Sequence, residues 1–308
     1  MSDLYNIQYL PHAQIDKQKW DRCIEQADNG LIYTYSFYLD AMAENWDALV
    51  LNDYEIVMPL TWKRKFGFNY LYQPFLTAQL GLFGKNLTES IRDDFFKAIP
   101  RSFTYIDISL NSGNILAWPS GFLVHRSNYE LNLSKTYNEL YENYNENTRR
   151  NLKKGAQAGS TIKKGFDVEE VITLAVAQMK EHGDQSAKNI ERFRKLYRLL
   201  LAKKMATTYG VFSSTNELLA SSVFFFSANR AYYILVGNDP KGRDLGSSHA
   251  LIDGFIKDNA DHNIILDFEG SDIPSLAAFY RGFGAAHIAY PAVKINRLPF
   301  FLKWLKKG

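Results

Sequence analysis

The sequence predicts an α/β fold with mixed β-sheets and helices on both sheet faces, organised as two domains. The chain has 308 residues, more than one hydrophobic core usually supports, which favours two domains of about 150 residues each. Hydrophobic residues make up 46% and charged residues 22%, a composition typical of folded globular proteins. Strand-like and helical segments also alternate along the whole chain.

The first half combines short strands with three helices. Asp16 is placed to cap a helix that runs to about Ala27, and Ser36 begins a second helix that runs to about Glu44. The other elements expected here are strands at 6–10, 48–52, 55–61, 69–73 and 104–110, a helix at 87–99, and one or two strands within 122–133.

The second half shows the clearest pattern. Four helices are expected at 134–145, 147–158, 167–181 and 190–204. Strands at 207–213, 218–227 and 231–237 are joined by short turns, which predicts an antiparallel meander. A loop, a helix at 248–259, a strand at 263–267, a helix at 274–282 and a strand at 287–293 complete it. We therefore expect domains at 1–135 and 136–293, followed by a C-terminal tail at 294–308. One alternative is that this tail returns to pack on the first domain.

Composition excludes several classes of protein. A formal net charge of +3 is too small to indicate nucleic-acid binding by itself. The single cysteine, Cys23, excludes an intramolecular disulfide and a cysteine-based zinc site, and the six histidines have no ligand spacing, so we expect no metal. The N-terminus has no signal-peptide pattern and no apolar run approaches the ~20 residues of a membrane span. These features predict a cytoplasmic protein.

One glycine-bearing loop has the chemistry of a phosphate site. It leaves the strand at 231–237 and enters the helix at 248–259, where free backbone N–H groups and the helix dipole favour an anion. Glycine allows close approach of a ligand to the backbone. The candidate residues are Lys241, Gly242, Arg243, Gly246, Ser247 and Ser248. The alternative is a turn shaped by Gly and Pro, with solvated cations.

A second basic cluster lies on the expected helix at 147–158. Arg149, Arg150 and Lys153 share one helix face, with Lys154 beside it. That face has the charge to bind phosphates of a nucleotide-linked substrate, of coenzyme A or of a tRNA acceptor end. A solvated helix face is the alternative.

Three motifs carry a resemblance to a known family. Arg243-x-x-Gly246-x-Ser248 resembles the Gln/Arg-x-x-Gly-x-Gly/Ala motif with which GNAT acyltransferases hold the pyrophosphate of coenzyme A, and departs from it at Ser248. The segment 267–285, with its Asp-Phe-x-Gly-Ser start and Phe-Tyr-x-x-Phe-Gly-Ala end, resembles FemAB-type proteins, which are tandem GNAT folds. The Arg-rich segment 147–154 is similar to the helix between their two halves.

The resemblance implies two tandem GNAT-like domains and an N-acyltransferase that moves an acyl group from acyl-CoA to an amine. Glu269 lies just past a strand end, where open α/β sheets place ligands, and is the candidate base, acting directly or through water. Asp267 is the second candidate, with partnership to nearby backbone N–H groups as its alternative. Tyr280 matches the position at which GNAT enzymes place the acid for the leaving thiolate; an aromatic ring packed on the sheet is the alternative.

Two other functions stay open. One is a FemAB-like, aminoacyl-tRNA-dependent transferase of cell-wall precursor synthesis; the helices within 167–204 are short for the coiled-coil arm that the resemblance associates with tRNA use. The other is a non-catalytic binding module that retains the fold. The acceptor expected for a transferase is a small molecule or a peptidoglycan- or nucleotide-sugar-like compound, with tRNA as a minority alternative.

Overall fold

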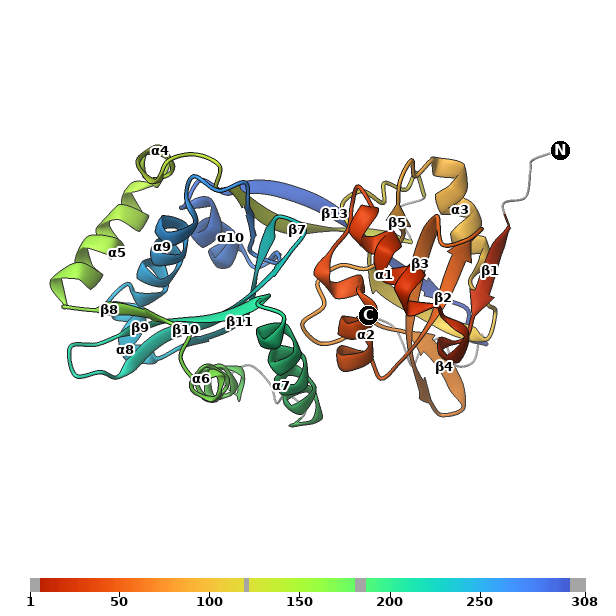
Figure 1. Ribbon diagram of the computed structural model, residues 1–308, viewed down its shortest axis with the longest axis horizontal. Helices are drawn as coiled ribbons and strands as arrows, with labels where there is room; N and C mark the ends of the chain where they lie inside the picture. The colour runs from red at the N-terminus through yellow and green to blue at the C-terminus, as the bar shows by residue number, and fades with distance from the viewer. Residues whose placement is uncertain (1–5, 119–121, 181–186, 300–308) are drawn as a thin grey trace. The chain divides into compact units, whose positions relative to one another are not determined.

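A computed structural model of the chain describes residues 6–118, 122–180 and 187–299. The chain divides into two compact units, Met1–Arg126 with Ala289–Gly308, and Ser127–Ile288 (Figure 1). β7 (Leu123–Asn132) and β13 (Ala286–Asn296) each contain residues of both units. No helix of the described residues is long and apolar enough to cross a membrane.

The first unit is a mixed sheet with helices packed on it. Its strand order is β1-β2-β3-β4-β6-β13, with β5 beside β3; β4 and β6 are parallel, and the other named pairs are antiparallel. Its strands are β1 Ile7–Leu10, β2 Asn45–Leu51, β3 Ile56–Lys65, β4 Phe68–Leu71, β5 Phe83–Gly84 and β6 Phe103–Ser109, and its helices are α1 Lys17–Gln26, α2 Ser36–Met42 and α3 Glu89–Ala98. Phe95 and Phe96 of α3 pack into the core with Leu60, Ile106 and Val293.

The second unit carries the candidate site. Its sheet runs β8-β9-β10-β11-β12-β7. Three antiparallel pairings connect β8 to β11, β11 and β12 are parallel, and β12 and β7 are antiparallel. The strands are β8 Thr161–Lys164, β9 Ala206–Phe212, β10 Leu218–Ser227, β11 Arg230–Asn238 and β12 Ile265–Asp267; the helices are α4 Tyr137–Glu142, α5 Glu146–Gln157, α6 Val168–Lys180, α7 Ala187–Ala202, α8 Pro240–Asp244, α9 Ser247–Asn259 and α10 Pro274–Arg281. The predicted meander of β9, β10 and β11 is confirmed.

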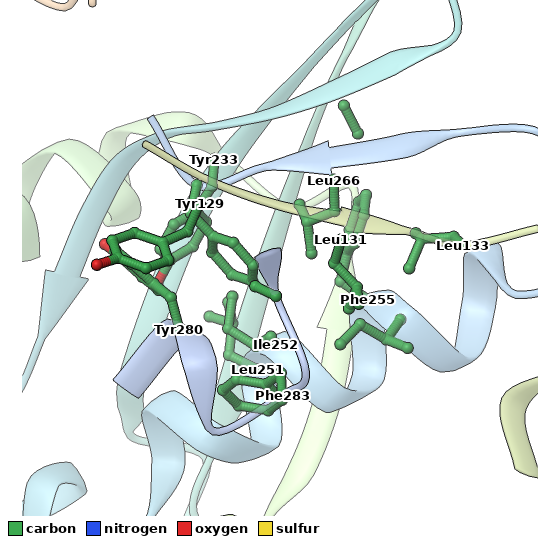
Figure 2. Packing of buried hydrophobic residues seen from close by; sticks show 14 of the residues in the cluster. Tyr129, Leu131, Leu133, Tyr233, Leu251, Ile252, Phe255, Leu266, Tyr280 and Phe283 are labelled. Atoms are coloured by element: carbon green, nitrogen blue, oxygen red, sulfur yellow. The ribbon is translucent and has the colours of Figure 1, made fainter. Parts of the chain in front are cut away.

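Helices cover both faces of this second sheet. Figure 1 shows α5, α9 and α10 on one side of it and α6 and α7 on the other. The core on the α9 side joins Phe255 of α9 to Phe224 of β10, with ring centroids 3.8 Å apart. Figure 2 shows the rings of Tyr129, Tyr233 and Tyr280 gathered at one end of this cluster. The predicted α/β class, with a mixed sheet between helices, is confirmed.

Several predicted elements differ from the structure for local reasons. The single helix expected at 134–145 is only α4, because Thr136 starts it with a capping box to Glu139 and Asn145 already caps α5. β8 was missed because all four of its side chains are exposed, so it has no apolar alternation. The expected loop after β11 contains α8, which Asp239 caps by accepting from the Lys241 amide. Residue 181 of the expected helix and residues 300–308 of the expected tail lie outside the described residues.

Candidate functional site

The parallel strands β11 and β12 separate early, and a cavity lies where they part. Their register covers three residue pairs and ends with Tyr232 opposite Asp267, whereas β11 continues to Asn238. A cavity of about 590 Å³ follows, lined from β11, α6, the first turn of α9, the turn after β12, and α10. We call it the strand-end cavity; its lining includes Tyr233, Asn238, Ser248, Phe268, Glu269 and Tyr280. The carboxyl end of parallel strands is where open α/β sheets place ligands.

A turn of unusual backbone conformation brings Glu269 to this cavity. Glu269 has φ +61° and Gly270 has φ +83°, so two consecutive residues are left-handed. The Glu269 amide donates to Oδ1 of Asp267 at 2.8 Å, which stabilises the turn. A Cβ atom on Gly270 would lie 2.3 Å from the carbonyl oxygen of Ser127, so only glycine fits there. The strained, half-buried Glu269 is held at the cavity wall.

Asp267 sits in a buried ion-pair network instead of the cavity lining. Its Oδ2 lies 3.0 Å from Arg230 Nη1, which also lies 2.7 Å from Glu130 Oε1. Asn128 Nδ2 donates to Asp267 Oδ1 at 3.0 Å. Burial raises the pKa of Asp267, while the charge of Arg230 acts to lower it. These contacts match the alternative weighed for Asp267, a partner of nearby N–H groups, and they position Glu269.

Tyr280 lines the same cavity from α10. Its ring stacks on Phe268, with centroids 4.5 Å apart, and also lies 5.9 Å from Tyr129 (Figure 2). The side chain is therefore packed on the sheet and at the cavity at once. Burial and, second, the negative charge of Glu269 raise the pKa of Tyr280. Its hydroxyl stays protonated at neutral pH and is available as a proton donor.

The predicted phosphate loop reaches the cavity through one residue, Ser248. Its Oγ donates to Asn238 Oδ1 at 2.6 Å, and both residues line the strand-end cavity. Gly246, at φ +70°, is the N-cap of α9. A Cβ on Gly246 would lie 2.5 Å from the carbonyl oxygen of Asn151, and one on Gly242 would lie 2.3 Å from that of Leu219. Chain packing therefore already requires both glycines.

The remaining loop residues lie away from the cavity lining. Ser247 is fully buried, and its hydroxyl has no hydrogen-bond partner among the described residues. Lys241 and Arg243 are exposed, and Lys241 Nζ lies 3.4 Å from Glu217 Oε1. Of the six loop candidates, the structure thus brings only Ser248 together with Glu269 and Tyr280.

The basic helix face borders a different cavity. Arg149, Arg150 and Lys153 of α5 line a space of about 680 Å³ that shares no lining residue with the strand-end cavity. Arg149 Nη2 donates to the carbonyl oxygen of Glu142 at 2.7 Å and so binds the C-terminal end of α4.

Residues that sequence reasoning did not select also form the strand-end cavity. The Oε1 atom of Gln178, from α6, accepts a 2.8 Å hydrogen bond from the Asn238 amide. Asn238 lies at the start of the predicted phosphate loop, but no spacing rule marks its side chain as a partner of Ser248. Tyr233 and Phe268 read as ordinary alternating core residues. Their role at the cavity follows from where β11 and β12 part, which the sequence pattern does not encode.

Comparison with known proteins identifies the second unit. Residues 142–272 match the family described as the acetyltransferase (GNAT) domain. No curated protein matches the sequence significantly.

The fold is shared with solved structures at low sequence identity. FemX is 12% identical, with a TM-score of 0.67 over 97% of this chain and 100% of that chain. A conserved protein of unknown function from Bacteroides thetaiotaomicron is 10% identical, with a TM-score of 0.57 over 94% and 99%. The C-terminal domain of a putative lysylphosphatidylglycerol synthetase from Agrobacterium fabrum is 10% identical, with a TM-score of 0.52 over 94% of each chain. Residues 142–272 of the second unit therefore match the GNAT acetyltransferase domain, and nearly the whole chain shares the fold of FemX.

Proposed function

We propose that this protein transfers an acyl group from an acyl-coenzyme A to an amine, with the strand-end cavity as the reaction site. The observation that carries the proposal is the meeting of Ser248, Glu269 and Tyr280, from three separate segments, in one cavity of the unit that contains the GNAT match. Each supplies one requirement of the reaction: donor binding, a base and an acid.

The donor arm fits the open side of β11. Beyond Tyr232, β11 is no longer paired with β12, so its outward-facing peptide groups before Asn238, whose amide donates to Gln178, are available to the amides of a pantetheine arm. The first turn of α9 begins at Ser247, and its N–H groups and dipole favour the donor pyrophosphate. Arg243, exposed one turn earlier, adds a positive charge near the same end.

Two side chains account for the two proton transfers that the reaction requires. Glu269 takes a proton from the acceptor amine, directly or through water, as the nitrogen attacks the thioester carbonyl. A C–N bond forms and the C–S bond breaks. Tyr280 donates its hydroxyl proton to the departing thiolate, and its raised pKa keeps that proton in place until then.

Thermal denaturation tests donor binding. A ligand at 100 times its Kd stabilises the folded state by about 2.7 kcal/mol, so coenzyme A and acetyl-CoA should raise the Tm by several degrees. Arg243→Glu should abolish most of this shift, whereas Arg198→Glu, the same charge change on an exposed residue of α7, should leave it intact. The absence of a shift with any acyl-CoA at millimolar concentration would contradict the proposal.

Aminoacyl-tRNA is the alternative donor, and fewer features of the structure support it. Lys163 Nζ donates to Asn216 Oδ1, and Lys164 Nζ lies 3.2 Å from Asp258 Oδ2, so both cations already have polar partners. Arg149 is bound to the end of α4. Of the two helices expected to supply an arm, α6 has 13 residues and α7 has 16. Filter binding of charged tRNA that survives 200 mM salt, a concentration that weakens purely electrostatic contacts, would favour this alternative.

A further inference from the structure

The basic cavity beside α5 is a site of its own in the second unit. It is lined by α4, α5, β8, β9 and α9 and has a volume of about 680 Å³. We call it the α5 cavity and define it by Tyr137, Arg149, Arg150, Lys153, Ala156 and Asp253. We propose that the α5 cavity binds a phosphate-bearing small molecule whose hydroxyl or amino group donates a hydrogen bond to Asp253.

Hydrogen bonds hold the two arginines on the α5 side, and no carboxylate of the described residues forms an ion pair with them or with Lys153. Arg149 is fixed by the carbonyl oxygens of Tyr141 and Glu142, at 3.4 and 2.7 Å, and its guanidinium lies 5.5 Å from the Tyr141 ring centroid. Arg150 Nη2 donates to Asn147 Oδ1 at 2.8 Å. Among the ion pairs of the described residues, none includes Arg149, Arg150 or Lys153. Each guanidinium therefore keeps further N–H groups for an anion.

The opposite wall supplies a carboxylate. Asp253 of α9 accepts a 2.9 Å hydrogen bond from the hydroxyl of Tyr137 at Oδ1 and lines the cavity. The Tyr144 hydroxyl also acts on Asp253, but a carboxylate has two oxygens and room for several donors, so these two tyrosines leave acceptor capacity for a ligand. Burial raises the pKa of Asp253, which makes an added donor more stabilising to its charged form.

The charges decide the ligand class. Three cations face one carboxylate, so the cavity is positive overall and favours an anion. Phosphate carries up to two negative charges and accepts the paired N–H groups of arginine, as well as lysine. Asp253 on the opposite wall favours a ligand with a hydrogen-bond donor. A phosphorylated compound with a hydroxyl or amino group should therefore bind more tightly than inorganic phosphate.

The cavity lies apart from the acyl-transfer chemistry although α9 contributes to both. Ser248 lines the strand-end cavity, whereas Ala250 and Asp253 line the α5 cavity. The backbone at Gly246 and Gly155 lets α5 and the start of α9 approach closely, because a Cβ at either glycine would meet the partner segment, at 2.5 Å from Asn151 O and 3.2 Å from Leu245 O. This proposal is independent of the acyl donor and of Glu269 and Tyr280.

Isothermal titration with ribose 5-phosphate, inorganic phosphate and ribose tests the proposal. We expect ribose 5-phosphate to bind about tenfold more tightly than phosphate, the value of one hydrogen bond to a charged group, and ribose alone not to bind measurably. No heat with ribose 5-phosphate up to 10 mM, or equal affinity for inorganic phosphate, would overturn it.

Substitutions at exposed residues test where the ligand binds without disturbing the hydrophobic core. Lys153→Glu should weaken ribose 5-phosphate binding about tenfold or more, because a charge-assisted hydrogen bond is lost and a repulsion added. Ala156→Trp, at an exposed lining residue, should block the cavity. Lys154→Glu is the matched control: it is the neighbouring exposed lysine but does not line the cavity. An equal loss in Lys154→Glu would show unspecific attraction and overturn the site.

Discussion

The backbone amide of Glu269 donates a 2.8 Å hydrogen bond to the buried carboxylate of Asp267 two residues before it. That contact connects the candidate base to the ion pair of Asp267 with Arg230. The side chain that faces the strand-end cavity is thus positioned by one that does not. Of the two acidic residues at the end of β12, Glu269 is the proposed reacting group and Asp267 the positioning residue.

Removing Asp267 should be costly to stability. Asp267→Ala leaves the Arg230 guanidinium buried with Glu130 as its remaining ion-pair partner, and we expect a loss of about 3–5 kcal/mol in the free energy of unfolding. Urea denaturation measures it. Asp244→Ala, at an exposed position in α8, should change stability by about 0.5 kcal/mol or less. Similar losses in both variants would show that the network has no special role.

Removing the charge of Glu269 should affect chemistry and leave the fold intact. With an amine that the wild type acylates, Glu269→Gln should lower kcat by about 10²–10⁴-fold, because proton removal from the amine is lost. The acetyl-CoA-induced Tm shift should persist, since the base does not hold the donor. Glu170→Gln, at an exposed residue of α6, is the control. An unchanged kcat in Glu269→Gln would favour a non-catalytic binding module.

The hydroxyl of Tyr280 is separable from its ring. Tyr280→Phe keeps the stacking on Phe268 and should leave the Tm nearly unchanged. We expect kcat to fall about tenfold to a hundredfold, at or below the lower end of the range for acid catalysis, because the thiolate of a thiol with a pKa near 8.5 is already a fair leaving group. If kcat holds while the Tm drops, the residue is only a packed aromatic.

His249 should make the second unit sensitive to acid. Its Nε2 is buried without a hydrogen-bond partner among the described residues, and burial lowers the pKa of His249 from 6.5 to about 4. Stability from the neutral ring is fully present above pH 6.5 and is lost as pH falls toward 4, because the unfolded chain binds the proton first. Between pH 7.5 and 5.0 this costs about 1–2 kcal/mol after solvent screening. Urea denaturation of His249→Phe should show a correspondingly smaller loss; an identical loss in both proteins would contradict it.

The turn of the β3–β4 hairpin places a non-glycine residue, Phe66, in a strained left-handed backbone conformation. Lys65 pairs with Phe68, which leaves a two-residue turn of Phe66 and Gly67 with φ values of +50° and +83°. Phe66 is 81% exposed, so packing does not compensate for its left-handed backbone. Phe66→Asn should stabilise the protein by about 0.5–1 kcal/mol, because asparagine suits this turn. Alanine, like phenylalanine, disfavours a left-handed backbone, so Phe66→Ala should stabilise the protein little. An equal gain in stability from Phe66→Ala would show that the exposed ring, and not the backbone strain, is the cause.

The sequence predicted the fold well where periodicity is strong. The meander of β9–β11 and the strand–helix alternation that follows are visible because buried side chains recur at fixed spacing. β8 and α8 were missed since exposed edge strands and one-turn helices have no such spacing.

The candidate site was predictable only in part. Glu269 and Tyr280 were found from a strand end and a family motif, and they do line one cavity. The glycines of the loop were assigned to ligand approach, whereas Gly242 and Gly246 are already required by contacts with Leu219 and Asn151. Such long-range contacts depend on tertiary packing and leave no local signal.

A crystal structure with bound coenzyme A tests the central claim most directly. The proposed function predicts the thiol in the strand-end cavity, within hydrogen-bond reach of the Tyr280 hydroxyl and on the side of Glu269, with the pyrophosphate at the first turn of α9. Coenzyme A bound with its thiol away from both side chains, or bound only in the α5 cavity, would contradict it.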